Sequence, residues 1–440
     1  MDEAENPKAA ETSAAADAAE AELAAAVADP ANASEAIAAA QALADSAASS
    51  GDAETAAAAA DEAATTATVP DPANAAEAVA AATPDSADAD PAEAAEPTLD
   101  TDALADLAQR PDDVARDAAR ARLADVAVGA VGLGRLEEIA TWLAGVQGVN
   151  PTVPILRARV VLFAGDHGVA SAGVSAFVPE ATAAQVKLIE GGGGAVNVLA
   201  RLHGASVRVV DVSVGRPSGR IDQEDAASRA EIDAAFRLGM AMADAEVDSG
   251  ADLLIPALVG VGHTTVASAL AGVLTGKDAA AVTGRGSGVD DAAWMRKCEA
   301  VRDAMRRGRP VLADQMQLLA VIGGRDFAAA CGFLLQAVIR KTPVLLDGVG
   351  IASCAMLVQR IAYRAPQWWL AGALSPEPAH KAALDRLSIE PLVSDYAVRE
   401  GHGVMALVAL PMVKAAAVLL AELPTFQEAG LPAPVLRSRI

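Results

Sequence analysis

Apolar residues begin to recur at helical spacing near residue 99, and this change predicts where the folded part of the chain starts. The periodic stretch ends at the glycine-rich segment from Gly129 to Gly134. We therefore expect a helical opening over residues 99–150 and an α/β core over residues 151–440. The predicted apolar stripe of the opening consists of Leu104, Leu107, Val114, Ala118, Leu123 and Val126.

Short aliphatic and β-branched runs, bounded by Gly, Pro or Asp, predict strands in the core. Longer stretches with helical spacing separate them, from Ala181 to His203 and from Ala227 to Val247. Alternating apolar strands and helices predict an α/β fold with a doubly wound, mostly parallel sheet, flanking helices and a smaller helical domain. Ligands of such sheets bind at the carboxyl ends of the strands. The predicted strands are Ala158–Phe163, Ser206–Val214, Leu253–Leu258 and Pro343–Leu346.

Two apolar or glycine-rich segments need a separate interpretation. The run from Val404 to Leu423 contains Pro411 and Lys414, so we expect a buried helix and no membrane span. Four consecutive glycines, Gly191 to Gly194, lie inside a stretch with helical spacing. They predict a close backbone approach, either by a ligand or by a neighbouring helix.

The first hundred residues differ in composition from the rest of the chain. Between Met1 and Asp100 there are 22 acidic residues and one base, so this stretch holds 21 of the 24 net negative charges. It contains no aromatic residue, since the first is Trp142. We predict that residues 1–98 are a disordered acidic extension rather than a folded repeat module. The net charge then says little about the partners of the folded part.

The cysteines argue against a disulfide framework and a structural zinc site. The chain has 3 cysteines, Cys298, Cys331 and Cys354, without C-x-x-C spacing. The acidic N-terminus does not resemble a secretory signal. We expect a cytoplasmic protein that binds neither nucleic acid nor membrane.

Two loops predict binding of a phosphate group. Gly260-Val261-Gly262-His263-Thr264-Thr265 follows a predicted strand and precedes a helical run. The loop from Thr283 to Asp291 has the same glycine and hydroxyl character, and Arg296 and Lys297 follow it. Backbone N–H groups at a helix start favour an anion. Each loop alone is equally typical of a tight turn, but together they favour a phosphorylated substrate.

Two further loops carry titratable residues. Asp166-His167 follows the first predicted strand, where shaping of the loop by local hydrogen bonds is favoured over metal binding. Glu400 stands between Arg399 and Gly401-His402-Gly403, just before an apolar run, which predicts a buried carboxylate at a helix start. Such a residue is either catalytic or simply favoured there by the helix dipole.

Taken as a set, these loops resemble the nicotinate-nucleotide–dimethylbenzimidazole phosphoribosyltransferases of cobalamin lower-ligand assembly. The resemblance runs from about Leu104 to Leu431 and leaves out the acidic extension. The segments that carry it are 163–169 (FAGDHGV), 193–201 (GGAVNVLAR), 260–265 (GVGHTT), 284–291 (GRGSGVDD), 345–348 (LLDG), 374–380 (LSPEPAH) and 399–403 (REGHG).

The resemblance implies transfer of the phosphoribosyl group of nicotinate mononucleotide to a benzimidazole-type base, with Glu400 as the general base. It also implies a homodimer that needs neither a metal nor an organic cofactor. The residues that it assigns to the phosphate and ribose are Gly260, Gly262, Thr264, Gly286, Ser287, Lys297 and Ser375. The residues that we assign to the base are Ser175, Phe177, Val178, His263 and His402.

Three positions depart from the family's pattern. Leu258 stands where an acidic residue is usual, His263 where Asn is usual, and His402 where a small hydroxyl residue is usual. Leu258 favours one alternative, a catalytically weak relative that binds an azole or a nucleotide. A second alternative is a hydrolase that releases ribose 5-phosphate without an acceptor base.

Overall fold

The computed structural model describes residues 98–128, 132–394 and 396–433. These residues contain a six-stranded sheet with the strand order β2-β1-β3-β4-β5-β6, in which every neighbouring pair is parallel. The predicted α/β fold with a parallel sheet is therefore confirmed. The strands are β1 (Ala158–His167), β2 (Ala205–Ser218), β3 (Leu253–Val259), β4 (Val344–Leu346), β5 (Trp369–Ala373) and β6 (Pro391–Val393).

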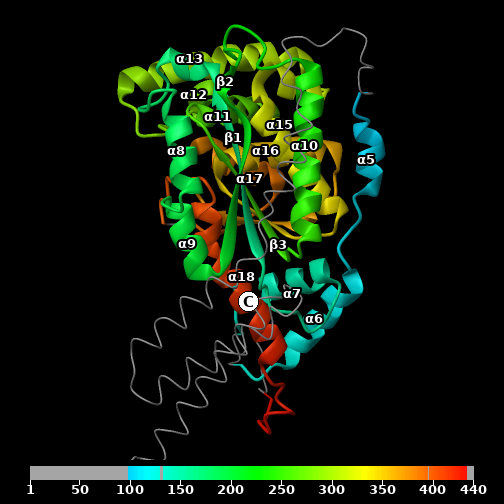
Figure 1. Cartoon of the computed structure of the whole chain (residues 1–440). Coiled ribbons are helices and arrows are strands. Elements are labelled where there is room, and N and C mark those ends of the chain that lie inside the picture. Colours follow the sequence, from blue (N-terminus) through cyan, green and yellow to red (C-terminus); the bar gives the residue numbers. More distant parts are fainter. Residues whose placement is uncertain (1–97, 129–131, 395, 434–440) are drawn as a thin grey trace, which may run out of the picture. The chain divides into compact units, whose positions relative to one another are not determined.

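Helices cover both faces of the sheet (Figure 1). The α-helices are α5 (Thr101–Leu107), α6 (Asp113–Asp125), α7 (Arg135–Gln147), α8 (Ala181–Glu190), α9 (Ala195–His203), α10 (Arg229–Asp248), α11 (His263–Thr275), α12 (Ala279–Val282), α13 (Asp291–Gly308), α14 (Gln315–Leu318), α15 (Arg325–Ile339), α16 (Gly348–Ile361), α17 (Pro378–Leu387) and α18 (Val404–Glu422). Shorter helical turns are η2 (Gly168–Ala172), η3 (Arg309–Val311), η4 (Leu319–Gly323) and η5 (Ala365–Trp368).

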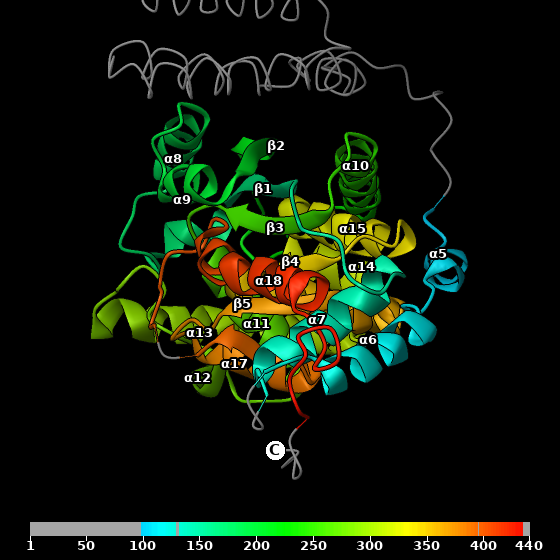
Figure 2. The same cartoon turned by 90° about the horizontal axis from the view of Figure 1, so that it is seen from below.

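The order of the strands explains how the helices divide between the faces. The chain moves outward from β1 to β2, then crosses back over β1 to β3 and continues in one direction to β6. Because crossovers between parallel strands are right-handed, this reversal places α8 and α9 on one face and α10 and α15 on the other. Figure 2 shows this division on either side of β1, β2 and β3. The reversal also leaves a crevice between the carboxyl ends of β1 and β3.

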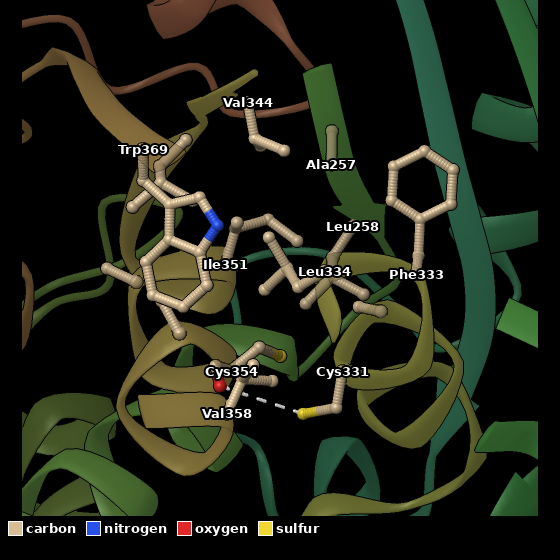
Figure 3. Close-up of a cluster of buried hydrophobic side chains, with 14 of the residues drawn as sticks. Ala257, Leu258, Cys331, Phe333, Leu334, Val344, Ile351, Cys354, Val358 and Trp369 are labelled. Carbon is tan, nitrogen blue, oxygen red and sulfur yellow. Dashed lines mark hydrogen bonds between the residues drawn. The ribbon is translucent and has the colours of Figure 1, made fainter. Parts of the chain in front are cut away.

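The centre of the sheet is buried on both sides, which explains its continuous apolar runs. Every residue of β3 is buried. Figure 3 shows Ala257 and Leu258 of β3 beside Phe333 and Leu334 of α15, with Ile351 of α16 next to them. Leu258 is therefore part of the core, and it lies one residue before the end of its strand.

The helical opening forms as predicted, but its apolar stripe differs from the prediction. Leu107 is 54% exposed and Val114 is 80% exposed, whereas Ala115, Ala119 and Leu123 face the core. The small alanines allow α6 and α7 to approach closely, so they take the buried face that the larger side chains were expected to take. Helix α6 is further tied to α18, because Arg122 donates from Nε to the carbonyl oxygen of Leu420.

The stretch from Ala181 to His203 was predicted as one helix, and this was wrong. The glycine run ends α8 at Glu190 and starts α9 at Ala195. Gly192 has a φ of +77°, which favours glycine, and a Cβ on Gly193 would lie 2.7 Å from Leu188 Cδ1. The glycines therefore serve a tight turn between two helices.

Helix α18 is the predicted buried helix. Among the described residues it is the one helix long and apolar enough to cross a membrane by length and composition, and 56% of its apolar 18-residue stretch is buried. It packs against α7, α9 and β5, as expected for a core helix.

The sequence missed two strands, and one predicted segment lies outside the described residues. Strands β5 and β6 were not predicted, because β5 contains Gly372 and β6 has only two apolar residues after Pro391. A Cβ on Gly372 would lie 2.6 Å from the carbonyl oxygen of Met405, so glycine allows α18 to lie against β5. The predicted disordered extension, residues 1–98, falls outside the described residues except for Thr98.

Candidate active site

A pocket with an empty volume of about 930 Å³ lies at the carboxyl ends of the central strands. Segments that follow β1, β3, β4 and β5 line it, together with the loop before α18. Its position at the reversal of strand order is where open α/β sheets bind ligands. Of the residues predicted for the site, the pocket is lined by Ser175, Phe177, Gly260, Gly262, His263, Thr264, Gly286, Ser287, Ser375, Glu400 and His402.

The loop after β3 forms the first wall of the pocket. Gly262 has a φ of +98° and caps the start of α11, which begins at His263. A Cβ on Gly260 would overlap the carbonyl oxygen of Gly165 at the end of β1. Glycine is therefore required for the close approach of the two loops, and the start of α11, with His263 and Thr264, lines the pocket at the helix end where an anion is favoured.

The loop from 284 to 290 forms a second wall next to the first, because a Cβ on Gly286 would lie 2.8 Å from Thr264 Oγ1. Gly286 has a φ of +50°, and its N–H donates to Glu377 Oε1 at 2.8 Å. Ser287 Oγ accepts from the N–H of Ala176 at 2.9 Å and lies 3.1 Å from Ser175 Oγ. These contacts join the loop predicted to bind phosphate to the segment predicted to bind the base.

Lys297 lies behind this wall rather than on it. Its side chain has no exposed surface, and Nζ donates to Thr264 Oγ1 at 2.9 Å and lies 4.0 Å from Glu377 Oε2. Burial lowers the pKa of Lys297, while the carboxylate of Glu377 opposes that shift. Lys297 thus contributes positive charge beneath Thr264 and Gly286 without lining the pocket in this structure.

Ser375 is held by a buried histidine. His380 Nδ1 accepts the N–H of Ser375 at 3.1 Å, so this nitrogen carries no proton, and it lies 3.0 Å from Ser375 Oγ. Burial lowers the pKa of His380 to about 4, which keeps the ring neutral near pH 7. The hydroxyl of Ser375 therefore points its hydrogen at His380 and presents lone pairs to its other neighbours.

Glu400 lines the pocket with Gly260 and Gly286, but it is not buried as predicted. Its side chain is 58% exposed, because the loop 396–403 lies at the rim and only Gly403 begins the core helix. Oε1 lies 3.1 Å from His402 Nδ1. The hydrogen bond from His402 lowers the pKa of Glu400, and burial opposes the shift, so the side chain is a carboxylate near pH 7.

His263 is a neutral acceptor on the same side of the pocket. Nδ1 lies 2.6 Å from the carbonyl oxygen of Gly260, which can only accept, so Nδ1 carries the hydrogen. Burial lowers the pKa of His263 to about 4. Its Nε2 therefore has a free lone pair, and its ring centroid lies 6.4 Å from that of His402.

Asp347, at the end of β4, was not predicted as a site residue. Its two carboxylate oxygens accept from the N–H groups of Gly403 at 2.9 Å and Ala406 at 3.0 Å, so it caps α18 from another element. Burial raises its pKa to about 6, although these hydrogen bonds oppose the shift. Asp347 fixes the start of α18 and therefore the loop that holds Glu400.

The proposed base-binding residues are only partly brought together. Phe177 lines the pocket, but Val178 is 64% exposed and does not. Val178 stands where the chain bends into the turn before α8, and its carbonyl oxygen accepts the N–H of Ala181. Leu258, singled out in the sequence for its missing acid, lines the pocket. Sequence reasoning missed the rest of the apolar lining, which comes from Val261, Val349, Ile351 and Met405.

Sequence reasoning also missed three polar lining residues, Glu377, Arg399 and Gln185. Glu377 and Arg399 stand inside segments that carry the family resemblance, which was the available signal. Within the described residues, no three His, Cys, Asp or Glu side chains gather to hold a metal ion.

A doubly wound sheet whose carboxyl edge carries two glycine-hydroxyl loops, with a carboxylate across the same pocket, defines an α/β enzyme that handles a sugar phosphate. The family model described as phosphoribosyltransferase matches residues 108–431. Together with the relatives described next, it shows that the chain belongs to the nicotinate-nucleotide–dimethylbenzimidazole phosphoribosyltransferase family.

Proteins named nicotinate-nucleotide–dimethylbenzimidazole phosphoribosyltransferase are similar over nearly their whole length. That of Streptomyces avermitilis is 52% identical over 344 residues, which cover 74% of this chain and 92% of the relative. That of Mycobacterium ulcerans is 47% identical over 335 residues, which cover 73% and 93%. The crystal structure of CobT from Thermus thermophilus is 33% identical with a TM-score of 0.70, and the match covers 73% of this chain and 100% of that one.

Proposed function

We propose that this chain transfers the phosphoribosyl group of nicotinate mononucleotide to 5,6-dimethylbenzimidazole or a similar base. The products are α-ribazole 5'-phosphate and nicotinate. One observation carries the proposal: a single pocket joins the loops of Gly260 and Gly286 to the carboxylate of Glu400. Relatives that bear the name of this activity align with the chain over 92% to 97% of their own length.

The reaction is a displacement at the anomeric carbon. Nicotinate is a good leaving group, because its ring nitrogen is cationic in the nucleotide and neutral after the bond breaks. The unprotonated nitrogen of the benzimidazole attacks C1', and attack on the face opposite the nicotinate gives the α-riboside. As the new bond forms, the benzimidazole becomes cationic and its other N–H becomes acidic.

Glu400 is the group that we assign to this proton. A carboxylate is a proton acceptor only when ionised, and the hydrogen bond from His402 favours that state by lowering its pKa. Its negative charge also stabilises the positive charge that develops on the incoming base. The apolar lining formed by Leu258, Val349 and Ile351 suits the flat hydrocarbon edge of a benzimidazole.

The phosphate is assigned to the two glycine-hydroxyl loops. Thr264 and Ser287 both line the pocket with hydroxyl groups, and the start of α11, whose helix dipole favours an anion, lines it as well. Lys297 supplies a buried positive charge through Thr264. Ser375, whose hydroxyl hydrogen is engaged by His380, suits a ribose hydroxyl donor better than the phosphate.

The proposal is tested by incubating the purified chain with nicotinate mononucleotide and 5,6-dimethylbenzimidazole, followed by chromatography of the products. We expect equimolar α-ribazole 5'-phosphate and nicotinate. Absence of nicotinate release at high enzyme concentration would favour the catalytically weak relative that binds an azole or a nucleotide. Release of ribose 5-phosphate without a base would indicate the hydrolase instead.

We further propose a cytoplasmic location and a homodimer. Cys298, Cys331 and Cys354 are all free thiols, which suits a reducing compartment. Leu188, Val198 and Leu202 are exposed on α8 and α9, a face that a second copy of the chain could cover. Light scattering of the purified protein at several concentrations measures the mass, and a monomer throughout contradicts the dimer.

A further inference from the structure

His402 makes the one contact that fixes the orientation of Glu400. Among residues 98–128, 132–394 and 396–433, it is the only side chain that forms an ion pair or hydrogen bond with the Glu400 carboxylate. The carboxylate is 58% exposed, whereas the side chain of His402 is only 15% exposed. A half-exposed glutamate with three side-chain torsions has many rotamers, and the hydrogen bond from His402, which is mostly shielded from solvent, favours one of them.

The hydrogen in this contact belongs to His402. An ionised carboxylate has no proton to give, so Nδ1 of His402 carries the hydrogen and donates it to Oε1. Oε1 of Glu400 therefore accepts the hydrogen bond from His402. Oε2 remains available for a proton from the incoming base.

The backbone of His402 is held in a conformation that few side chains adopt. Its φ is +58°, in the left-handed region, and Gly403 follows at +90°. Asp347 fixes this turn by accepting the N–H of Gly403. The turn places the imidazole of His402 within hydrogen-bonding distance of Glu400. A non-glycine residue held at positive φ beside a pocket indicates a functional constraint.

Other titratable groups face the same space from each neighbouring element. They are His263 from the start of α11, Asp347 from the end of β4, Glu377 from the start of α17, and Arg399 on the same loop. His263 is neutral near pH 7, because burial lowers its pKa to about 4. Within the described ranges, Arg399 and Glu377 form no contact with Glu400 or His402 that competes with the Nδ1 to Oε1 hydrogen bond.

We propose that His402 is a positioning residue for Glu400, holding one carboxylate oxygen so that the other faces the incoming base in its ionised form. This inference rests on the proposed function, because it concerns the base of that reaction. It assigns to His402 a role other than direct contact with the benzimidazole. Loss of the hydrogen bond then changes proton acceptance and leaves the nucleotide site intact.

The test compares three substitutions by measuring kcat and kcat/KM for 5,6-dimethylbenzimidazole across pH. His402→Gly and His402→Ala both remove the donor, and glycine also relieves the left-handed backbone. His402→Asn keeps an N–H donor, because its amide nitrogen is bonded to Cγ as Nδ1 is, and Asn tolerates positive φ. His203→Ala, at the end of α9 and outside the pocket, is the matched control.

We expect His402→Gly and His402→Ala to lower kcat about tenfold at pH 7, as for loss of a hydrogen bond to a charged group, with the affinity for nicotinate mononucleotide unchanged. Because His402 lowers the pKa of Glu400, its removal also moves the acid-side limb of the pH profile to higher pH. His402→Asn should keep the limb close to that of the unsubstituted chain.

An acid-side limb at the same pH in the unsubstituted chain and in the Gly and Ala variants would overturn the inference. So would a loss that appears only as weaker nucleotide binding. Either result leaves the proposed function standing, provided that the unsubstituted chain forms α-ribazole 5'-phosphate. Failure of the unsubstituted chain to do so would instead remove the proposed function itself.

Discussion

Substitution of Lys297 by Met separates the structural role of the buried charge pair from its role in nucleotide binding. Lys297 Nζ lies 4.0 Å from Glu377 Oε2, and both side chains are buried. At an effective dielectric constant of about 20, two unit charges at this distance attract by about 4 kcal/mol. Removing one partner leaves a buried carboxylate without a counter-charge, which costs about 3–5 kcal/mol in free energy of unfolding.

The double variant Lys297→Met with Glu377→Gln removes both charges. Glu377→Gln retains an oxygen that accepts the N–H of Gly286. We expect the double variant to recover about 2 kcal/mol of the free energy of unfolding relative to Lys297→Met alone, as measured by urea denaturation at pH 7. Its affinity for nicotinate mononucleotide, measured by calorimetry, should stay ten- to about a hundredfold below that of the unsubstituted chain, because the positive charge is still missing.

Two results would refute this reasoning. If the effects of the single substitutions on unfolding add to within about 0.5 kcal/mol, then the two charges are not coupled. If the double variant binds nicotinate mononucleotide as tightly as the unsubstituted chain, then Lys297 has no part in holding the phosphate.

The remaining predictions concern Asp347 and Gly286. The pKa of Asp347 is raised from 3.8 to about 6, so its ionisation opposes folding: stability that is present below pH 4 is lost as pH rises to 6, by about 3 kcal/mol. Asp347→Asn should abolish this part of the pH dependence in urea unfolding between pH 4.5 and pH 7, and an unchanged slope would contradict the assignment. A Cβ on Gly286 would lie 2.7 Å from Lys297 Nζ, so Gly286→Ala should weaken nucleotide binding at least about tenfold. Gly288→Ala is the control, since Gly288 also has positive φ but nothing lies within 4 Å of the added carbon, and equal loss in both variants would rule out a specific role for Gly286.

The sequence was sufficient to predict the parts of the fold that repeat a simple pattern. Strands β1 and β3 are apolar runs followed by glycine, so both they and their loops could be recognised. Strands β5 and β6 were not predicted, because Gly372 interrupts β5 and β6 has only two apolar residues after its proline, Leu392 and Val393. Gly372 of β5 is required by the close approach of α18, which is a contact between segments far apart in the sequence.

The sequence indicated site residues that are recognised by residue type and loop position. It did not indicate features that depend on burial. Thr264 and Ser287 are hydroxyl residues beside glycines, and both line the pocket. Whether a carboxylate is buried depends on what packs over it, so Glu400 was expected to be buried and is half exposed. Asp347 is 3% exposed and accepts two N–H groups from the start of α18, although the sequence shows only an Asp before a glycine.

The most direct test of the account is the turnover of the Glu400→Gln variant with nicotinate mononucleotide and 5,6-dimethylbenzimidazole. Gln preserves size but accepts no proton, so we expect kcat to fall by about 100-fold or more, as for loss of a general base, while calorimetry shows unchanged affinity for nicotinate mononucleotide. Nicotinate release at the rate of the unsubstituted chain would mean that another group takes the proton, and the central role of Glu400 would be wrong.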